Sequence, residues 1–247
     1  MSAALDWDYS ELARHYRLRA PYAANAIDAL LALCALGPGD ACVDIGAGTG
    51  RLAGPLVERG LRVTALEPNP HMRAIGAGEV PRAHWHAASG EAPGLPSASA
   101  RLVSFGSSFN VLPPKAALDA AASLLEAGGW MACLWNHRDL DDPLQVRVQR
   151  VIEHFVPDFR HGSRRDDPTA LIAADGRFGP VSSLCVRFRH RAAVHDFVDG
   201  FRAHATLVRQ AGDRLAPILR ALEEELRDQA FVDVPFCTRI YAAQCSA

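Results

Sequence analysis

The stretch of residues 43–52, Val-Asp-Ile-Gly-Ala-Gly-Thr-Gly-Arg-Leu, constrains the fold of this chain more than any other. Apolar and β-branched residues at 42–45 predict a short buried strand, and apolar residues return at helical spacing from residue 52. Gly46, Gly48 and Gly50 stand between the two. Such a turn lets a ligand approach the backbone, and the following helix directs free N–H groups at it. The sequence therefore predicts a strand, a ligand-binding turn and a helix.

The spacing of the glycines separates two classes of ligand. A dinucleotide site takes the pattern G-x-G-x-x-G, but here the third glycine is Gly50 and Arg51 stands where that pattern needs glycine. Asp44 precedes the turn, and an acid there suits a ligand with a cationic amino group better than a pyrophosphate. The stretch, with Ala47 between the first two glycines, resembles motif I of the class I S-adenosylmethionine-dependent methyltransferases. The resemblance implies S-adenosylmethionine as cofactor and S-adenosylhomocysteine as product.

An acid closes the second predicted strand. Residues 61–66 alternate as a strand, and Glu67-Pro68 follows it, about 20 residues past the glycine turn. At this distance a carboxylate accepts hydrogen bonds from the 2′ and 3′ hydroxyls of a ribose, and we predict this role for Glu67, with Pro68 beside it. The resemblance implies that Met72, in the next helix, packs on the adenine ring; a place in the hydrophobic core is the alternative.

A third segment of the resemblance follows the predicted strand at 83–87. Ser89-Gly90-Glu91 is similar to the family segment G-x-A-E-x-L-P, which implies an adenine contact from the Ser89 hydroxyl and the Gly90 N–H, with Glu91 alongside. The segment departs from the family in carrying Ser89 in place of an acid and Gly90 in place of Ala. His84 and His86 share one face of the strand, but no third ligand is near in sequence, so no metal site is expected.

The turn after strand four, predicted at 101–105, should flank the ligand crevice with the end of strand one. It resembles the A-F-H-W turn of small-molecule methyltransferases. This resemblance places Ser107 on the cofactor and Phe109 and Asn110 on the substrate, with Asn110 where the family often has a histidine.

The N-terminal pattern A-x-x-Y…R-x-P-Y resembles the helical cap of small-molecule methyltransferases. It implies that Tyr16 and Arg19 touch the methionine end of the cofactor and that Tyr22 lies near the substrate. An ordinary packing helix with solvated arginines is an equally good interpretation.

Taken together, the predicted elements describe an α/β protein: a Rossmann-like, doubly wound, mostly parallel sheet of seven strands with helical lid insertions. We expect one methyltransferase domain over residues 1–247. Its expected parts are an N-terminal helical cap (1–37), a cofactor-binding core (38–138) and two insertions that form a substrate lid (139–176 and 192–233).

The composition of the chain limits the partners and the cellular compartment that we expect. The net charge is -2 and no dense run of Lys or Arg occurs, so no nucleic-acid partner is expected. The six cysteines form no C-x-x-C pair, and we expect them to be reduced and buried. No apolar signal core or membrane-length run is present, which favours a soluble cytoplasmic protein without a membrane partner.

The function expected from these features is methyl transfer by in-line displacement to a small-molecule acceptor, with a secondary metabolite as one candidate. His137 is the first candidate for a general base, followed by His15 and by His204, which is also a candidate substrate contact. A SAM-binding protein that does not methylate (a regulatory subunit or a cyclisation catalyst) remains an alternative, as does an NAD-linked oxidoreductase. The oligomeric state, monomer or homodimer, and O-, N- or C-methylation stay open.

Overall fold

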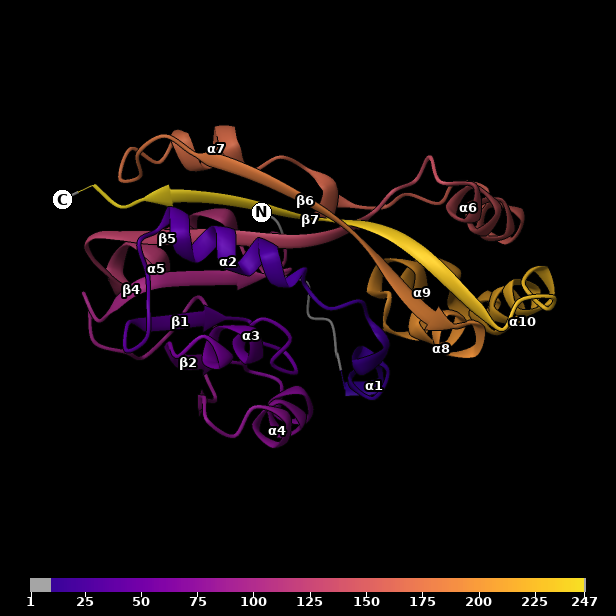
Figure 1. Cartoon of the computed structure of the whole chain (residues 1–247), viewed down its shortest axis with the longest axis horizontal. Coiled ribbons are helices and arrows are strands. Elements are labelled where there is room, and N and C mark those ends of the chain that lie inside the picture. Colours follow the sequence, from indigo (N-terminus) through magenta and orange to yellow (C-terminus); the bar gives the residue numbers. More distant parts are fainter. Residues whose placement is uncertain (1–9, 247) are drawn as a thin grey trace.

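A seven-stranded sheet runs through the centre of the protein (Figure 1). The computed structural model describes residues 10–246, so residues 1–9 of the expected N-terminal cap and residue 247 lie outside the described residues. The strand order is β3-β2-β1-β4-β5-β7-β6, with β7 antiparallel to both of its neighbours and the remaining pairs parallel. The expected α/β fold with a mostly parallel, seven-stranded sheet is confirmed. The strands are β1 (Ala41–Ile45), β2 (Arg62–Leu66), β3 (His84–His86), β4 (Ala100–Gly106), β5 (Leu125–Arg138), β6 (Ser182–Ala193) and β7 (Phe231–Gln244).

Helices cover both faces of the sheet because its strands are apolar on both sides. In β1, Cys42 packs into one hydrophobic cluster, whereas Val43 and Ile45 pack into the other. The first cluster contains residues of α2 and α3, and the second contains residues of α5 and α7. The helices beside the sheet are α2 (Ala24–Leu33), α3 (Ala53–Glu58), α4 (Pro70–Glu79), α5 (Pro114–Leu124) and α7 (Thr169–Ala173).

A second group of helices lies beyond the carboxyl end of β5 and has its own hydrophobic cluster (Figure 1). The long strands β6 and β7 run from the sheet to this group, which we call the lid. No helix of residues 10–246 is both long and apolar enough to span a lipid bilayer. The lid consists of α6 (Pro143–Phe155), η3 (Ser163–Arg165), α8 (Val194–Asp199), η4 (Gly200–Ala203), α9 (Ala205–Ala211), η5 (Gly212–Arg214) and α10 (Leu215–Glu225).

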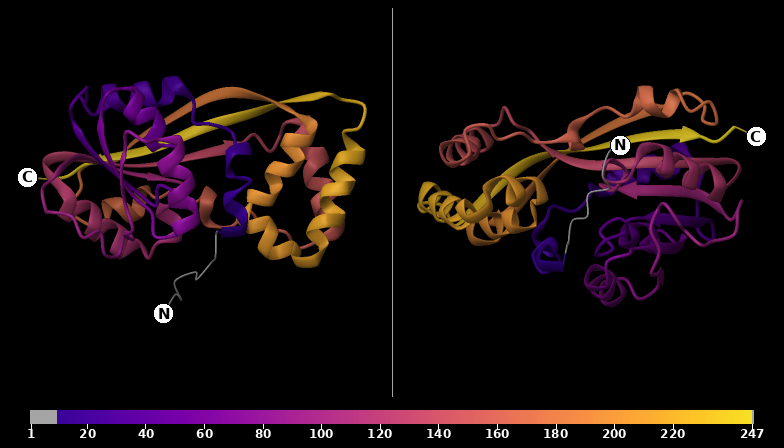
Figure 2. Two further views of the ribbon diagram at one scale, coloured as in Figure 1. Left: turned by 90° about the horizontal axis from the view of Figure 1, so that it is seen from below. Right: turned by 180° about the vertical axis from the view of Figure 1, so that it is seen from behind.

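The N-terminal segment lies between the sheet and the lid, as Figure 2 shows in indigo. It contains α1 (Ser10–Ala13) and the single turn η1 (Tyr16–Leu18). The α1 helix contacts α4 of the core, and η1 contacts α8 and η4 of the lid. Residues that follow η1 are therefore placed where the two halves of the protein meet.

The structure differs from the expected division of the chain in two places. The α2 helix, assigned to the N-terminal cap, packs on the sheet through Ile27 and Leu30. The α7 helix, assigned to the lid, packs on the opposite face through Ile172. In each case an apolar face met the sheet, which sequence spacing alone does not reveal.

Two cysteines correct the expectation that all six are reduced. Cys185 of β6 and Cys237 of β7 form a disulfide, with their Cα atoms 6.0 Å apart. They are 52 residues apart in sequence, and only the antiparallel pairing of β6 with β7 brings them together. Cys34, Cys42 and Cys133 are free and buried, and Cys245 is free and half-buried.

Two glycines of α4 give a matched test of the packing around Trp85. A Cβ on Gly76 would lie 2.1 Å from the Trp85 ring, whereas a Cβ on Gly78 would meet no atom within 4 Å. We expect Gly76→Ala to lower the free energy of unfolding by about 1–3 kcal/mol, because the ring must move. Gly78→Ala should raise it by up to about 1 kcal/mol, because alanine favours helix. Urea unfolding of both variants measures this, and an equal effect of the two would contradict the described packing.

Candidate functional site

The glycine turn between β1 and α3 is fastened to the end of β2. The N–H groups of Gly46 and Ala47 both donate to the Leu66 carbonyl, at 2.9 and 3.0 Å. Gly46 and Gly48 have φ angles of +67° and +58°, which favour glycine. A Cβ on Gly46 would lie 2.6 Å from the Ser108 Cβ, whereas the Gly48 position is open. The turn therefore brings β1 and the loop after β4 together and leaves bare backbone at Gly48.

Asp44, in β1, is a fully buried carboxyl group with one oxygen unpaired. The Ser104 hydroxyl donates to Oδ1 at 2.8 Å, whereas Oδ2 has no hydrogen-bond partner among the described residues. The pKa of Asp44 is raised to about 7, chiefly by burial and also by the nearby Glu67 carboxylate, although the Ser104 hydroxyl and the Ala53 backbone N–H lower it. A cationic group bound at Oδ2 would satisfy this oxygen and favour its charged form.

Glu67 directly follows β2, and backbone N–H groups hold its carboxylate. Gly48 donates to Oε2 and Asn69 donates to Oε1, both at 2.8 Å. Burial raises the pKa of Glu67, against these two hydrogen bonds. Each carboxylate oxygen has a further lone pair, so the fixed group can still accept from two hydroxyls.

These groups line one cavity of about 650 Å³, which the ends of β1, β2, β4 and β5 form with η1 and the lid. The volume lies in the usual range of small-molecule sites. Among the described residues, three buried side-chain atoms have no hydrogen-bond partner: Asp44 Oδ2, Thr49 Oγ1 and Gln145 Nε2. All three residues line this cavity. Because buried polar atoms are nearly always paired, their clustering indicates a ligand-binding site.

His137, near the end of β5, lines the same cavity. Its Nε2 lies 2.9 Å from the Arg164 carbonyl oxygen, which only a protonated nitrogen can bond, so Nε2 donates. Burial lowers the pKa of His137 to about 4, and Arg165 and Arg164 lower it further, against the bond to the carbonyl. The imidazole is therefore neutral at pH 7, with its lone pair on Nδ1.

Comparison with known families agrees with this geometry. Residues 43–133 match a family model described as a methyltransferase domain. This stretch of the chain, which includes most of β1, the glycine turn and strands β2, β3 and β4, therefore resembles a methyltransferase domain.

Individual relatives extend the comparison. An uncharacterized methyltransferase from Mycobacterium tuberculosis is 33% identical over 130 residues, which cover 53% of this chain and 52% of the relative. The chain thus spans about half the length of the curated relatives it matches. A structure from Anaeromyxobacter dehalogenans, provisionally assigned as a type II methyltransferase, covers 92% of this chain and 97% of its own at 19% identity, with a TM-score of 0.64. A phosphoethanolamine N-methyltransferase from Haemonchus contortus, solved with S-adenosylhomocysteine, covers 90% of this chain and 52% of its own at 13% identity, with a TM-score of 0.53. Both structures share the fold.

Most of the site residues predicted from the sequence lie at this cavity. Those that line it are Tyr16, Arg19, Tyr22, Asp44, Gly46, Ala47, Gly48, Glu67, Pro68, Met72, Ser89, Gly90, Ser107, His137 and His204. Tyr22 donates or accepts a hydrogen bond with the Ser107 hydroxyl at 3.1 Å, which joins the N-terminal segment to the loop after β4.

Four predicted site residues lie elsewhere. Gly50 serves packing, because a Cβ there would lie 2.8 Å from the Val80 side chain. Glu91 is exposed and lies outside the cavity lining. Phe109 is buried in the core, edge-on to Phe105, and Asn110 accepts a hydrogen bond from the Trp135 indole at 3.0 Å. The turn after β4 therefore directs these two side chains to Phe105 and Trp135, and neither residue lines the cavity.

Four other histidines were considered in the sequence. His204 Nδ1 accepts the Leu207 N–H at 3.1 Å and caps α9, so its other ring nitrogen can act only as a donor. His15 Nδ1 lies 2.8 Å from Asp199 and outside the cavity lining. His84 and His86 are exposed, and no group of three metal-ligating side chains occurs in the described part of the chain.

Sequence reasoning missed several lining residues. Thr49 lies inside the glycine turn, and Arg138 ends β5 in a segment whose position beside the ligand was predictable. Gln145 and Arg165 come from the lid, whose sequence carries no motif. The place of Arg138 at the carboxyl end of a central strand is the one signal that was available.

The buried Asp44 carboxyl gives a test by stability. Its pKa is about 7 in the fold and near 3.8 when exposed, so between these values the folded state holds a proton that the unfolded state lacks. We expect this group to lower the free energy of unfolding by on the order of 1 kcal/mol per pH unit as the pH rises from about 4 to 7. Urea unfolding of wild type and Asp44→Asn across this range should show that the variant lacks this component. The exposed Asp213→Asn variant is the control, and an unchanged slope in Asp44→Asn would contradict the assignment.

Proposed function

We propose that this protein transfers a methyl group from S-adenosylmethionine to a small-molecule acceptor. The observation that carries the proposal is the unpaired Oδ2 of the buried Asp44, which lines the cavity beside the bare backbone of Gly48. A buried carboxyl oxygen next to an open glycine turn fits a compact ligand that carries an ammonium group. The α-amino group of S-adenosylmethionine supplies that charge.

The other lining residues fit the remaining parts of this cofactor. We assign the ribose hydroxyls to the Glu67 carboxylate, which Gly48 and Asn69 already hold in place. Met72 is buried at the cavity wall, and with Ser89 and Gly90 it would hold the adenine. Tyr16 and Arg19 would meet the methionine end, and the Arg19 guanidinium lies 5.0 Å from the centre of the Tyr16 ring. The nematode enzyme of the same fold, solved with S-adenosylhomocysteine, supports this choice of cofactor.

Bound S-adenosylmethionine supplies a methyl group on a positively charged sulfur, ready for displacement by a nucleophile. The residues of this chain align the acceptor with it and exclude water. The lid brings Val148, Ile152 and Phe159 to the cavity wall, so the surroundings of the reacting atoms are largely apolar. A reaction that removes charge is favoured in such surroundings. A cavity of this volume beside the lid also suits a small acceptor, and we propose a monomer or homodimer without a nucleic-acid partner.

His137 remains the proposed general base. Its Nε2 is fixed by the Arg164 carbonyl, which leaves Nδ1 as the atom that can accept a proton. With a pKa of about 4 it is neutral at pH 7, ready to accept but weakly basic. An acceptor whose nucleophile is acidic or already ionised therefore suits this site best.

Calorimetric titration with S-adenosylhomocysteine tests the cofactor assignment. We expect wild type to bind it and Glu67→Gln to bind about 10- to 100-fold more weakly, because the variant loses charged hydrogen bonds to two hydroxyls. Glu91→Ala is the matched control: this carboxylate was predicted near the cofactor, but it is exposed outside the cavity, and its removal should leave the affinity unchanged.

Two outcomes would overturn the proposal. Wild type that binds NAD but not S-adenosylhomocysteine would assign the site to an oxidoreductase. Wild type that binds S-adenosylhomocysteine but consumes no S-adenosylmethionine with any small-molecule acceptor would leave a binding protein that does not methylate.

A further inference from the structure

Charge is divided between the two ends of the cavity. The acidic residues that line it, Asp44 and Glu67, lie at the ends of β1 and β2, where the cofactor is proposed to bind. Among the described residues that line the lid end, Arg138 and Arg165 are cations and none is a carboxylate. Arg165 is exposed, but Arg138 is half-buried, and a charge withdrawn from water is normally paired, so the position of Arg138 requires an explanation.

Arg138 is the centre of this arrangement. Its guanidinium lies 4.3 Å from the ring centre of Phe201 and 5.4 Å from that of Phe197, both in the lid. Among residues 10–246 it has no carboxylate within ion-pair distance. Burial, together with the charges of Arg19 and Arg164, lowers the pKa of Arg138 to about 9, so the group is charged at neutral pH. Two rings orient this cation without neutralising it.

Gln145 supplies a second, independent observation. Its side chain, on α6 of the lid, is 3% exposed, and its amide nitrogen has no hydrogen-bond partner among the described residues. It lines the same cavity as Arg138. A buried N–H donor without an acceptor and a half-buried cation without a carboxylate partner fit the same kind of ligand group, one that is rich in oxygen and negatively charged.

We propose that the lid end of the cavity binds an oxyanion, a carboxylate or phosphate group, on the methyl acceptor, through Arg138 and Gln145. The arginine fork matches such a group with two parallel hydrogen bonds, and Arg165 adds positive charge at the same end of the cavity. This inference rests on the proposed function, because it names the class of acceptor for that reaction. The rival ligand is the cofactor's own carboxylate, since Arg19 lies near enough to affect the Arg138 guanidinium.

The test uses defined probes on the full chain saturated with S-adenosylhomocysteine. Benzoate and phenyl phosphate carry the two oxyanions, and benzamide is the neutral control of the same shape as benzoate. We expect at least one anion to bind at least tenfold more tightly than benzamide, by ligand-observed NMR or calorimetry. Tighter binding of benzoate than of phenyl phosphate would assign a carboxylate to the acceptor, and tighter binding of phenyl phosphate would assign a phosphate. Equal binding of benzamide and both anions would overturn the proposal.

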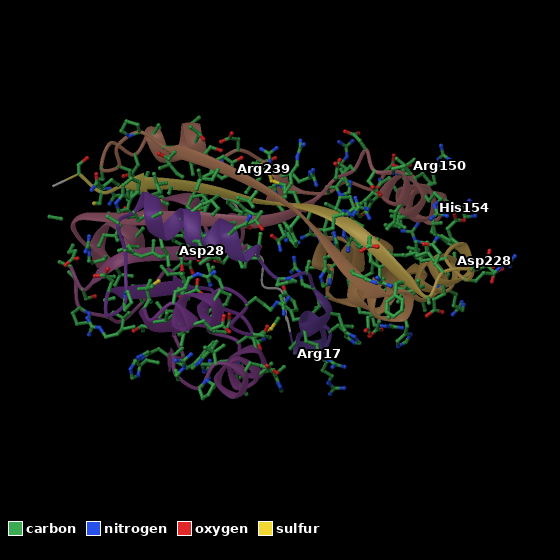
Figure 3. The ribbon with its side chains drawn as sticks, viewed as in Figure 1. Arg17, Asp28, Arg150, His154, Asp228 and Arg239 are labelled. Carbon is green, nitrogen blue, oxygen red and sulfur yellow. A yellow bond between two sulfur atoms is a disulfide. The ribbon has the colours of Figure 1, made fainter. Side chains whose placement is uncertain are left out.

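Variants locate the oxyanion. Arg138→Gln should weaken binding of the preferred anion at least tenfold and change S-adenosylhomocysteine affinity less than twofold, which also shows that the variant is folded. Gln145→Leu keeps the lid core filled and should weaken binding of the anion several-fold. Arg150→Gln is the matched control, because Arg150 is an exposed arginine on the same α6 at the outer edge of the lid (Figure 3). Anion binding unchanged in both Arg138→Gln and Gln145→Leu would overturn the proposal.

A final comparison tests whether Arg138 binds the carboxylate of the cofactor and not that of the acceptor. 5′-Methylthioadenosine lacks the carboxylate of S-adenosylhomocysteine. If Arg138→Gln weakens S-adenosylhomocysteine but leaves 5′-methylthioadenosine unchanged, Arg138 binds the cofactor and the proposal is overturned. Failure of wild type to bind S-adenosylhomocysteine would instead overturn the proposed function, and the comparison of benzoate with benzamide on the unliganded protein would still report on the oxyanion site.

Discussion

The site depends on the hydrogen bonds that hold two carboxyl groups at the ends of neighbouring parallel strands. Ser104 of β4 donates to Asp44 of β1, and the N–H of Gly48 donates to Glu67 after β2. Three strands and the glycine turn are thereby fixed relative to one another before any ligand binds. This arrangement buries the Asp44 carboxyl group and leaves one of its oxygens unpaired, which is energetically unfavourable. A bound ligand with a positive charge would offset this unfavourable burial. The binding site is therefore a place where the fold is locally less stable than it could be.

The lid is a second hydrophobic unit that depends on the sheet for its position. Its cluster includes Phe197, Phe201, Leu219 and Leu222, and it joins the sheet through Val232 and Val234 at the start of β7. Strands β6 and β7 thus have two functions: their sheet ends complete the core, and their far ends carry the lid. The N-terminal turn η1 fills the remaining side, in contact with α8 and η4. A cavity made by three separate segments can close around a small ligand from all sides.

The local parts of this structure were predictable, and the long-range parts were not. The glycine turn and Glu67 follow from spacing along one strand-turn-helix unit, where neighbours in sequence are also neighbours in space. Phe109 and Asn110 were predicted at the substrate because they follow β4, but a one-residue change in a turn decides whether a side chain meets the cavity or the core. Gln145 carries no motif, and its role comes only from where the lid core places α6. The pairing of Cys185 with Cys237 likewise depends on strand register, which the sequence pattern did not specify.

The charge distribution connects the candidate base with the proposed acceptor. His137 donates through Nε2 to a carbonyl of η3, and the arginines of that same turn help to keep its pKa near 4. Arg165 and Arg164, which line the same cavity, therefore weaken His137 as a base. A weak base suffices where the acceptor's nucleophile ionises easily, and it fails where a proton must be removed from an ordinary alcohol. An acceptor that is held by one negative group and has an acidic or ionised nucleophile elsewhere would fit both the positive charge at the lid end and the weak basicity of His137. The lid that supplies the charge also excludes water, so the nucleophile loses its hydration shell where the sulfonium charge is removed.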